Sequence, residues 1–354
     1  MHVLQVVASV GWAGLERCVV EVSNELAKEH QVTVLLPPSA VYRDRFVDAV
    51  RLEPIPAGSR RNPLTNARLG KAVRAIGPDI VHAHATKASE MVWWASRMPG
   101  GLGVPFVATK HNTRRSRIFD YIEHVTGVSK AVARSVPGGQ RVHVVGNGVR
   151  RREVTPRPKP DVFTMASITR LDPYKRVDVL IRALAELDFP ARLVIAGEGS
   201  EREALESLAG EVGVAEQVDF LGLIDDVPEL LSSVHMQVTA STREGFSLGI
   251  IEGLQYADVV LTTPVGGAPE ILTEDFLVGG NADDAIAASA KSRRDVEHAG
   301  VTAAAFAESI TRIHADYDRY VTDFAELRAR HGVRFTWEAV TGAYLEVYAQ
   351  VLDS

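Results

Sequence analysis

Apolar runs alternate with amphipathic segments along the first half of the chain. The run "HVLQVVAS" (2–9) is followed by "ERCVVEVSNELAKEH" (16–30), in which apolar residues recur at helical spacing, and then by "QVTVLLP" (31–37). A strand–helix–strand unit with short connections predicts a parallel pair of strands. Short apolar runs of the same kind predict further strands at 79–85, 105–111, 124–129 and 142–149.

The pattern breaks and then restarts in the second half. Residues 151–162 are rich in Arg and Pro and have no apolar period, which predicts a linker. Beyond the linker, the alternation predicts strands at 163–168, 191–199, 217–222, 236–241 and 259–264, and helices at 177–188, 200–213 and 247–257. We expect Ser200 to cap the second of these helices and Ser247 to cap the third.

Two such series in tandem predict an α/β protein with two Rossmann-like, doubly wound parallel-sheet domains, 1–150 and 163–334. A length of 354 residues suits two domains. A final helix over 335–354 has an apolar stripe made of Trp337, Val340, Tyr344, Val347 and Tyr348. Open sheets of this kind bind ligands at the carboxyl ends of their strands. If the two edges face each other, the active site is the cleft between the domains.

The charge is divided unevenly between the halves. Residues 1–150 hold 20 Lys and Arg against 11 Asp and Glu, although the whole chain has a net charge of −6. A basic half suits an anionic substrate or an anionic membrane surface. The arginines that would meet such a partner include Arg60, Arg61, Arg114, Arg115 and Arg117.

The ends and the cysteine content bear on localisation. Cys18 is the one cysteine, so the chain has no internal disulfide. The N-terminus lacks the basic region and cleavage pattern of a secretory signal, and no apolar run approaches the roughly 20 residues of a membrane span. We therefore expect a cytoplasmic protein.

The stretch "REGFSLGIIEG" (243–253) places two carboxylates, Glu244 and Glu252, around an apolar helix start. The free N–H groups at such a start form an anion site, and Gly245 and Gly249 let a ligand approach the backbone closely. Two acceptor carboxylates beside a phosphate cradle suit a ligand that carries both hydroxyls and phosphate. That description fits a sugar nucleotide.

Three more candidates follow strands of the second half. Arg170 and Lys175 come after one strand and could bind a diphosphate, Arg as a fork and Lys as a point charge. The turn from Gly197 to Gly199 follows the next strand, and short glycine turns of this kind are common. Backbone around Ile224, one strand later, could hold a base.

The first half offers weaker signals. Gly14 lies in the first strand–helix turn, but the dinucleotide glycine fingerprint is incomplete, which disfavours a nicotinamide cofactor. His82 and His84 point the same way on a strand, yet no third ligand has sensible spacing, so we expect no metal site. His111 ends a strand that faces the predicted cleft and could contact a sugar.

Together these stretches resemble glycosyltransferase family 4, the group 1 glycosyl transferases with the GT-B fold. "REGFSLGIIEG" is similar to the E-x7-E signature of that family, and "RLDPYK" to its Arg and Lys diphosphate clamp. "VIAGEGSEREAL", "GGAPEIL", "PDIVHAH" and "NGV" match in order and spacing. One departure is Asp258, which stands where the family usually has a glycine.

The resemblance implies a metal-independent, retaining transfer of a sugar from a nucleotide donor to an acceptor hydroxyl, with no cofactor. It implies that Glu252 holds the ribose, that Glu244 contacts the donor sugar, and that Arg170 and Lys175 hold the diphosphate. It also implies a place in the site for Gly14, His111 and the backbone of Phe246, Ser247, Leu248 and Gly249. Gly197, Ile224 and Gly245 join the candidate site from the residue patterns above.

The expected partners are a nucleotide sugar, with uridine favoured because it is common in the family, and a glycan or lipid-linked acceptor such as a lipopolysaccharide core. No nucleic acid is expected. Contact with an anionic membrane at the inner face of the cell membrane is a further hypothesis. A sugar-nucleotide epimerase of the same fold, a nicotinamide oxidoreductase and a non-catalytic nucleotide- or carbohydrate-binding protein stay open as alternatives.

Overall fold

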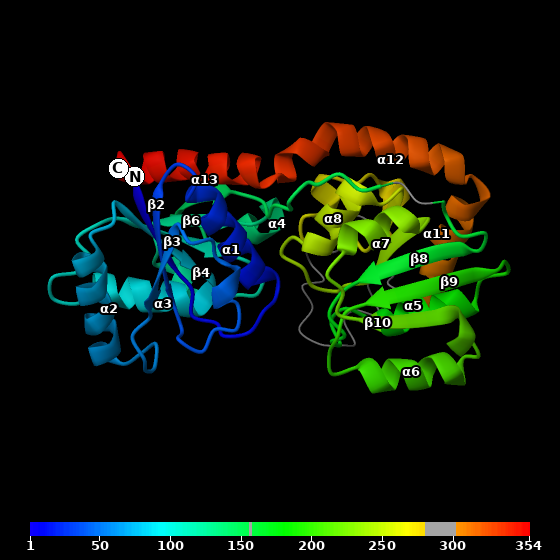
Figure 1. Ribbon diagram of the computed structural model, residues 1–354, viewed down its shortest axis with the longest axis horizontal. Helices are drawn as coiled ribbons and strands as arrows, with labels where there is room; N and C mark the ends of the chain where they lie inside the picture. The colour runs from blue at the N-terminus through cyan, green and yellow to red at the C-terminus, as the bar shows by residue number, and fades with distance from the viewer. Residues whose placement is uncertain (156–157, 280–301) are drawn as a thin grey trace. The chain divides into compact units, whose positions relative to one another are not determined.

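The computed structural model describes residues 1–155, 158–279 and 302–354. The chain divides into two compact units, which we call unit 1 and unit 2 (Figure 1). Unit 1 comprises Met1–Gly148 and Phe335–Ser354, and unit 2 comprises Val149–Arg334.

Unit 1 contains a seven-stranded sheet in the order β3-β2-β1-β4-β5-β6-β7, with all neighbours parallel. Its strands are β1 (His2–Val6), β2 (Gln31–Leu36), β3 (Val50–Pro54), β4 (Ile80–His84), β5 (Phe106–Lys110), β6 (His124–Gly127) and β7 (Arg141–Val144). Its α-helices are α1 (Gly14–Leu26), α2 (Pro63–Ile76), α3 (Ala85–Ser96), α4 (Lys130–Arg134) and α13 (Trp337–Leu352). The predicted strand 142–149 is shorter than expected, because the chain leaves the sheet after Val144.

The two faces of the unit 1 sheet differ in chemistry. One face is apolar and packs against α2 and α3 through residues such as Leu69 and Val92. The other face carries what we call the polar ladder, which consists of Gln5, His82, His84, Thr109 and Thr126.

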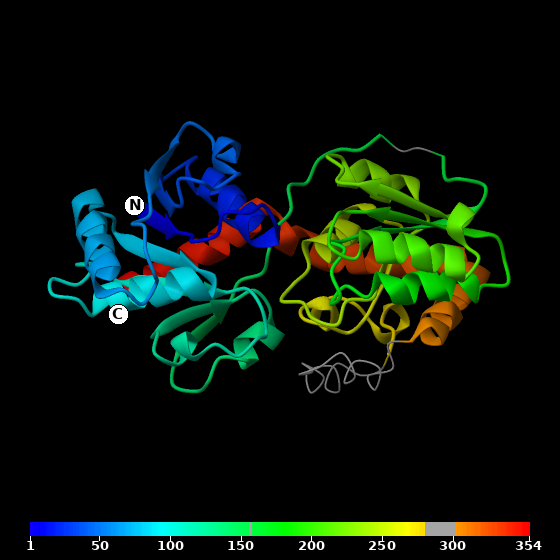
Figure 2. The same cartoon turned by 90° about the horizontal axis from the view of Figure 1, so that it is seen from below.

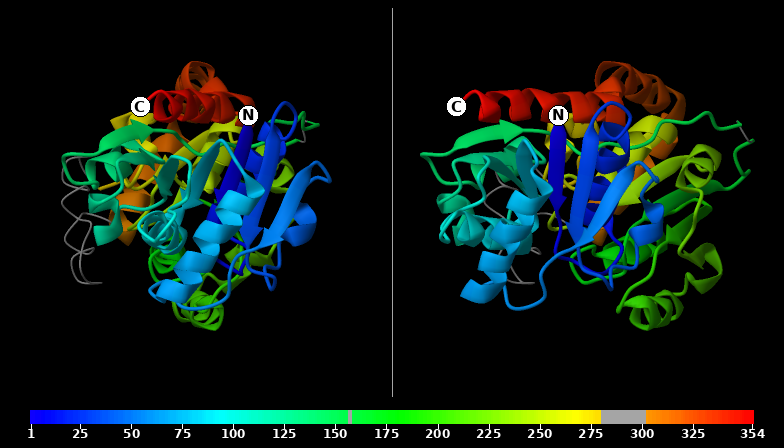
Figure 3. Two further views of the ribbon diagram at one scale, coloured as in Figure 1. Left: turned by 90° about the vertical axis from the view of Figure 1, so that its left-hand side faces the viewer. Right: turned by 60° about the vertical axis from the view of Figure 1, so that its left-hand side comes forward.

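Helices α13 and α1 pack together in unit 1, and α13 contacts β5 (Figure 3). The predicted apolar stripe of this last helix is confirmed, because Trp337, Tyr344 and Tyr348 are all buried. The tyrosine hydroxyls of α13 give the polar ladder partners that an aliphatic helix could not offer.

Unit 2 contains a five-stranded parallel sheet in the order β10-β9-β8-β11-β12. Its strands are β8 (Phe163–Ile168), β9 (Ala191–Ala196), β10 (Val218–Gly222), β11 (Met236–Thr239) and β12 (Val259–Thr262). Its described α-helices are α5 (Val177–Ala185), α6 (Arg202–Glu211), α7 (Val227–Ser233), α8 (Leu248–Tyr256), α11 (Ala303–Ala315) and α12 (Tyr317–His331). Helices α5, α6 and α11 cover one face, and α7, α8 and α12 the other (Figure 2). Two parallel-sheet domains confirm the predicted fold class.

Of the two predicted serine caps, one occupies the N-cap position of its helix and the other does not. Helix α6 begins after Glu201, so the cap predicted at Ser200 is wrong. Ser247 does occupy the N-cap position of α8, but its side chain makes no capping hydrogen bond. The turns that precede both helices are fixed instead by backbone contacts with neighbouring loops, as described below.

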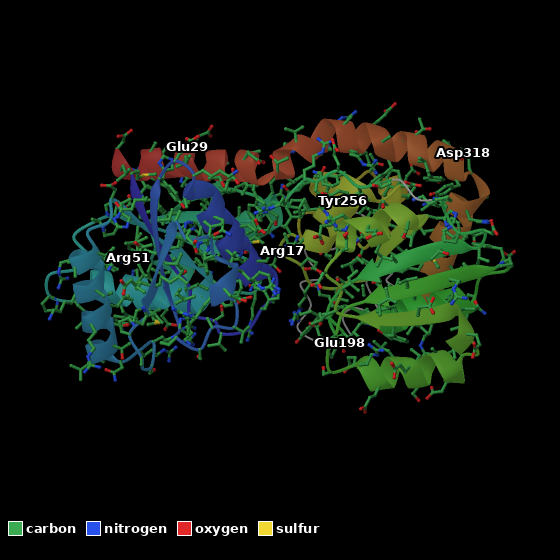
Figure 4. All side chains as sticks on the ribbon, viewed as in Figure 1. Arg17, Glu29, Arg51, Glu198, Tyr256 and Asp318 are labelled. Carbon is green, nitrogen blue, oxygen red and sulfur yellow. The ribbon has the colours of Figure 1, made fainter. Side chains whose placement is uncertain are left out.

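The stretch 151–162 lies against unit 2, with residues 156–157 outside the described residues. Arg152 donates its backbone N–H to the hydroxyl of Tyr256, which is labelled in Figure 4. Lys159 pairs with Asp258 at 3.0 Å, and Tyr317 of α12 donates to the same carboxylate at 2.9 Å. Asp258 therefore connects residues 151–162 with α12. These two contacts account for a carboxylate at a position where a glycine was expected.

Candidate functional site

The loops that leave β8 and β9 are bonded to each other beyond the sheet. Thr169 N–H donates to the carbonyl of Ala196 at 3.0 Å, and Leu171 N–H donates to the carbonyl of Glu198 at 2.9 Å. Glu198 is labelled in Figure 4. A Cβ on Gly197 would lie 1.7 Å from the Thr169 carbonyl oxygen, and one on Gly199 would lie 2.2 Å from that of Leu171. Both glycines are therefore needed to bring the two loops together.

Asp172 organises the turn that carries the two predicted cations. Its Oδ1 accepts from the backbone N–H of Tyr174 at 3.1 Å. Its carbonyl oxygen accepts from the backbone N–H of Lys175 at 3.0 Å. Its Oδ2 pairs with Arg170 at 2.9 Å. The Arg170 side chain remains 66% exposed, so its guanidinium is available to a ligand. Asp172 was missed in the sequence, although an Asp-Pro pair is a common turn signal.

Lys175 and Glu244 form a close ion pair, with Nζ and Oε1 2.5 Å apart. Their side chains are only 15% and 11% exposed, so water screens the pair weakly. Neighbouring contacts hold the two loops in this position. Thr242 donates its backbone N–H to the Tyr174 carbonyl at 2.8 Å, and Arg243 stacks on the Tyr174 ring at 4.8 Å.

The loop from Glu244 to Ser247 rests on a second glycine pair in the stretch "GGAPEIL". A Cβ on Gly266 would lie 2.5 Å from the Gly245 carbonyl oxygen, and one on Gly267 would lie 2.5 Å from the ring of Phe246. Gly266 also has a φ of +58°, which favours glycine. Gly245 and Phe246 are thus buried against this glycine pair.

Helix α8 begins close to the end of β8. A Cβ on Gly249 would lie 3.0 Å from the Ile168 carbonyl oxygen, and Gln237 of β11 donates to the Gly249 carbonyl at 2.8 Å. Glu252 is buried one turn into the helix, whereas Ser247 and Leu248 at its start are partly exposed. The first amides of α8 therefore lie at the carboxyl edge of the sheet, where the helix dipole favours an anion.

The loop that carries the remaining candidate of unit 2 is joined to the Gly197 turn, because Gly197 N–H donates to the Gly222 carbonyl at 2.7 Å. Ile224 is half-buried on the loop between β10 and α7, beside Leu223, whose side chain is 82% exposed. A cavity of about 690 Å³ in unit 2 is lined by Phe189, Arg192 and neighbouring residues. It opens near the amino end of β9 and contains none of the predicted site residues.

Unit 1 holds the two other candidates. Gly14 is the first residue of α1, whose preceding turn is fixed by Glu16, which accepts from the backbone N–H of Ala13 at 3.0 Å. His111 follows β5 directly, and its Nε2 lies 3.4 Å from Nδ1 of His84. Burial lowers the pKa of His111 to about 4, so the ring is neutral at neutral pH.

His82 and His84 lie side by side with ring centroids 4.0 Å apart, but their nitrogens bond to protein groups. His82 contacts Tyr348 and Thr109, and His84 contacts Gln5. Within 1–155, 158–279 and 302–354, no group of three or more His, Cys, Asp or Glu side chains is arranged to hold a metal ion.

The structure thus brings Lys175 and Glu244 together, with Arg170 on the same loop as Lys175 and α8 following Glu244. Sequence patterns did not reveal Gln237 or the Gly266–Gly267 support, since each acts through a contact with a distant segment, whereas the Asp-Pro pair could have indicated the turn at Asp172.

Comparisons with family models cover most of both units. Residues 12–153 match the model described as Glycosyltransferase Family 4, and residues 150–298 match the model described as Glycosyl transferases group 1. The helices of the described chain include none that is long and apolar enough to cross a membrane.

Two curated relatives match parts of the chain. The phosphatidylinositol N-acetylglucosaminyltransferase gpi3 subunit of Schizosaccharomyces pombe is 30% identical over 164 residues, which are 43% of this chain and 36% of that protein. D-inositol 3-phosphate glycosyltransferase of Mycobacterium marinum is 27% identical over 201 residues, which are 55% of this chain and 40% of that protein. The match therefore spans well under half the length of each relative.

A solved structure matches nearly the whole chain. Anabaena Alr3699/HepE in complex with UDP superposes with a TM-score of 0.79 and 17% identity, and the match covers 99% of this chain and 100% of the other. At that level of identity the likeness shows a common fold.

Proposed function

Because the chain belongs to the group 1 glycosyl transferases of family 4, with the GT-B fold, we propose that it moves a hexose from a nucleotide diphosphate donor to a hydroxyl of a glycan or glycolipid. The observation that carries this proposal is the Lys175–Glu244 pair beside the start of α8. A cation, a carboxylate and free helix amides at one sheet edge suit the diphosphate and the hydroxyls of such a donor.

In the proposal, each group has a separate task. Arg170 and Lys175, with the amides from Phe246 to Gly249, bind the diphosphate and stabilise the negative charge that develops as it leaves. Glu252 accepts from the ribose hydroxyls. Lys175 engages Oε1 of Glu244, so Oε2 is the oxygen that we assign to the donor sugar. Because Arg170 and Lys175 neutralise the departing diphosphate, we propose a reaction that needs no divalent metal. We also propose that the reaction retains the anomeric configuration.

We assign UDP as the nucleotide of the donor. The support is the solved structure of similar fold that holds UDP. Gly197 and Ile224 of unit 2 complete the donor site that we propose.

The test is calorimetric binding of UDP, GDP and ADP to the protein and to Arg170→Ala. We expect one diphosphate to bind, with UDP favoured, and Arg170→Ala to weaken its binding at least tenfold. Arg192→Ala is the matched control, since Arg192 is also a partly exposed arginine of unit 2 paired with an aspartate, at 2.8 Å from Asp219. Release of the nucleotide from its sugar donor, with EDTA present, then tests turnover.

Other results would redirect the assignment. If none of the three diphosphates binds, the clamp assignment fails. Binding without release of the nucleotide to any acceptor would favour a non-catalytic binding protein, and interconversion of the sugar without transfer would favour an epimerase.

The acceptor that we propose is anionic and lipid-linked, at the inner face of the cell membrane, as in lipopolysaccharide synthesis. The support is the basic character of residues 1–150, together with the two relatives, whose names specify phosphatidylinositol and inositol 3-phosphate. Arg114→Ala with Arg117→Ala should reduce sedimentation of the protein with anionic liposomes at low salt. Neutral liposomes are the control, and equal sedimentation with both kinds contradicts the membrane contact.

A further inference from the structure

Helix α8 packs on the unit 2 sheet through two glycines one turn apart, Gly249 and Gly253. A Cβ on Gly249 would lie 3.0 Å from the Ile168 carbonyl oxygen, and one on Gly253 would lie 2.6 Å from Cγ2 of Val260. Carbon atoms in contact prefer separations of about 3.5–4.0 Å. The helix therefore approaches β8 and β12 more closely than larger residues at these two positions would allow.

Gln237 of β11 lies between the two glycines and is fully buried, with an exposed fraction of 0%. Its Nε2 donates to the Gly249 carbonyl at 2.8 Å. A carbonyl oxygen only accepts, so the nitrogen of the amide must face Gly249, and the orientation of the amide is fixed. The amide oxygen is turned toward Gly253, whose Cβ would lie 1.8 Å from Oε1. The amide therefore takes the space that a side chain at residue 253 would need.

The surroundings of this amide are otherwise apolar. The buried residues of α8 include Ile250, Ile251 and Leu254. Burial of an amide costs free energy unless its polar atoms are bonded, and within 1–155, 158–279 and 302–354 the Oε1 of Gln237 has no hydrogen-bond partner. An aliphatic side chain would fill this place without that cost. The hydrogen bond to Gly249 is thus the property that distinguishes Gln237 from an apolar residue.

This hydrogen bond gives α8 a position along its own axis. Hydrophobic contacts are non-directional, so they hold the helix against the sheet without fixing how far it slides. Gly249 is the second residue of α8, and the directional bond from Gln237 therefore fixes the first turn. Gln237 pairs in register with Ala166 of β8. The start of the helix is consequently placed relative to two adjacent strands of the sheet.

The same bond acts on the amide of Ile250. The Gly249 carbonyl and the Ile250 N–H belong to one peptide unit, and a donor on the carbonyl polarises that unit and strengthens its N–H as a donor. Ile250 is the third residue of α8, so its N–H has no acceptor within the helix. The side chain of the N-cap, Ser247, makes no hydrogen bond to this turn. The cap thus leaves these N–H groups to another acceptor.

We propose that Gln237 is a positioning residue for the anion site at the start of α8, and that residue 253 is a glycine because the Gln237 amide occupies the space of its side chain. The second part stands on the contacts alone. The first part rests on the proposed function, in which the anion is the diphosphate of the donor. Gln237 touches no ligand in this proposal and acts through the helix.

The proposal separates the phosphate end of the nucleotide from the nucleoside end. Backbone amides at the start of α8 have no rotatable bonds with which to follow a shift of the helix. Glu252, which we assign to the ribose, can adjust by rotation about its side-chain bonds. Loss of the Gln237 hydrogen bond should therefore weaken the binding of a nucleoside diphosphate much more than that of the nucleoside.

Titration of UDP and of uridine into the protein and into Gln237→Met tests this difference. Methionine keeps the length of the side chain and removes the hydrogen bond. We expect UDP binding to weaken about tenfold and uridine binding to stay nearly unchanged. An equal loss for both ligands, or no loss for either, would overturn the positioning role.

Thr164→Val is the matched control for these titrations. It removes another buried hydrogen bond to a backbone carbonyl, from Thr164 Oγ1 to Val162 at 2.8 Å, at the amino end of β8. Because this end of the strand is opposite to the start of α8, we expect both ligands to bind the control as they bind the unaltered protein. A selective loss of UDP binding in the control as well would reject the assignment to Gln237.

Urea unfolding of the full chain tests the Gln237–Gly253 pair without any ligand. Gly253→Ala should lower the unfolding midpoint, and the loss should be smaller in a protein that already carries Gln237→Ala. The contact with Val260 is common to both backgrounds and cancels in the comparison. Equal losses in the two backgrounds would show that the amide does not determine which residue fits at 253.

Hydrogen exchange of the backbone amides, followed by mass spectrometry without ligand, tests the hold on the helix. Gln237→Met should speed exchange within residues 247–256, and Thr164→Val should not. Unchanged exchange in Gln237→Met contradicts the role of Gln237. If UDP does not bind the unaltered protein, the proposed function fails, while exchange and the unfolding comparison still decide whether Gln237 positions α8.

Discussion

Lys175 is held by Glu244 in a contact that is largely shielded from water, so the two side chains depend on each other. Removal of either one leaves a charge with poor solvation and without its partner, which costs more than the pair itself contributes. The same ammonium is the one that we assign to the diphosphate. Stability and ligand binding are thus linked at this residue and can be separated by a second substitution.

Lys175→Met should reduce the free energy of unfolding by about 2 kcal/mol, because Glu244 is left unpaired. It should also reduce UDP binding at least tenfold. Lys175→Met with Glu244→Leu should regain most of the stability but none of the binding, since an apolar pair can replace a buried ion pair. Urea unfolding and calorimetry measure the two effects. Recovery of UDP binding in the double variant would contradict the role of Lys175.

Among the elements, the strands of unit 2 follow closely from the sequence. Strand β8 has the predicted bounds, and β9 to β12 differ from the predictions by at most three residues at an end. These strands are short apolar runs between turn residues, a pattern that depends on local sequence alone. The candidate site was predicted for the same reason, because Lys175 and Glu244 lie on the loops that leave β8 and β11.

The polar ladder could not be predicted in the same way. Gln5 and Tyr348 are 343 residues apart, and each is unremarkable in its own segment. His82 and His84 attracted a metal hypothesis because their spacing is visible, whereas their actual partners come from other strands and from α13. The local sequence pattern predicts a helix or a strand. The contacts of a buried polar face depend instead on which elements pack together in the folded protein.

The polar ladder and the neighbouring His111 should make unit 1 sensitive to acid. Burial lowers the pKa of His82 to about 3 and that of His111 to about 4, against 6.5 for an unfolded chain. Between pH 6.5 and the lowered pKa of each ring, the unfolded chain binds a proton on that ring and the folded chain does not. The free energy of unfolding should therefore be constant above pH 6.5 and fall below it, by about 1.4 kcal/mol per pH unit for each ring down to its folded pKa.

The groups of α13 that face these rings, Tyr344 and Tyr348, stay neutral throughout, since burial raises the pKa of both. Urea unfolding of the full chain between pH 7.5 and 4.5, followed by the fluorescence of tryptophans, measures the effect. A midpoint that does not change between pH 6.5 and pH 5 would show that the rings are not buried in neutral form.

On the scale of the whole molecule, unit 2 is one continuous segment, whereas unit 1 is completed by Phe335–Ser354. Residues 149–334 produced alone should fold and bind UDP within about tenfold of the full chain, because Lys175, Glu244 and α8 all belong to unit 2. Residues 1–148 produced alone should show no cooperative unfolding, since the polar ladder loses Tyr348 and the buried stripe of α13.

Circular dichroism melts of the two segments, with UDP calorimetry on the second, measure this difference. Adding a peptide of residues 335–354 to the first segment should restore part of its cooperative transition. A cooperative melt of residues 1–148 without the peptide would contradict the structural role of α13.

The split of unit 1 along the chain also has a consequence for biosynthesis. The ribosome makes all seven strands of unit 1 first, then unit 2, and only then α13. At typical rates of translation the interval is roughly 10–40 s. During that time the nascent sheet exposes Gln5, His82 and Thr109 to water without their helix, while unit 2 can already be complete. The first half of this protein is therefore the part that would need protection by chaperones during synthesis. A message truncated within unit 2 would leave unit 1 without α13 and unable to complete its fold.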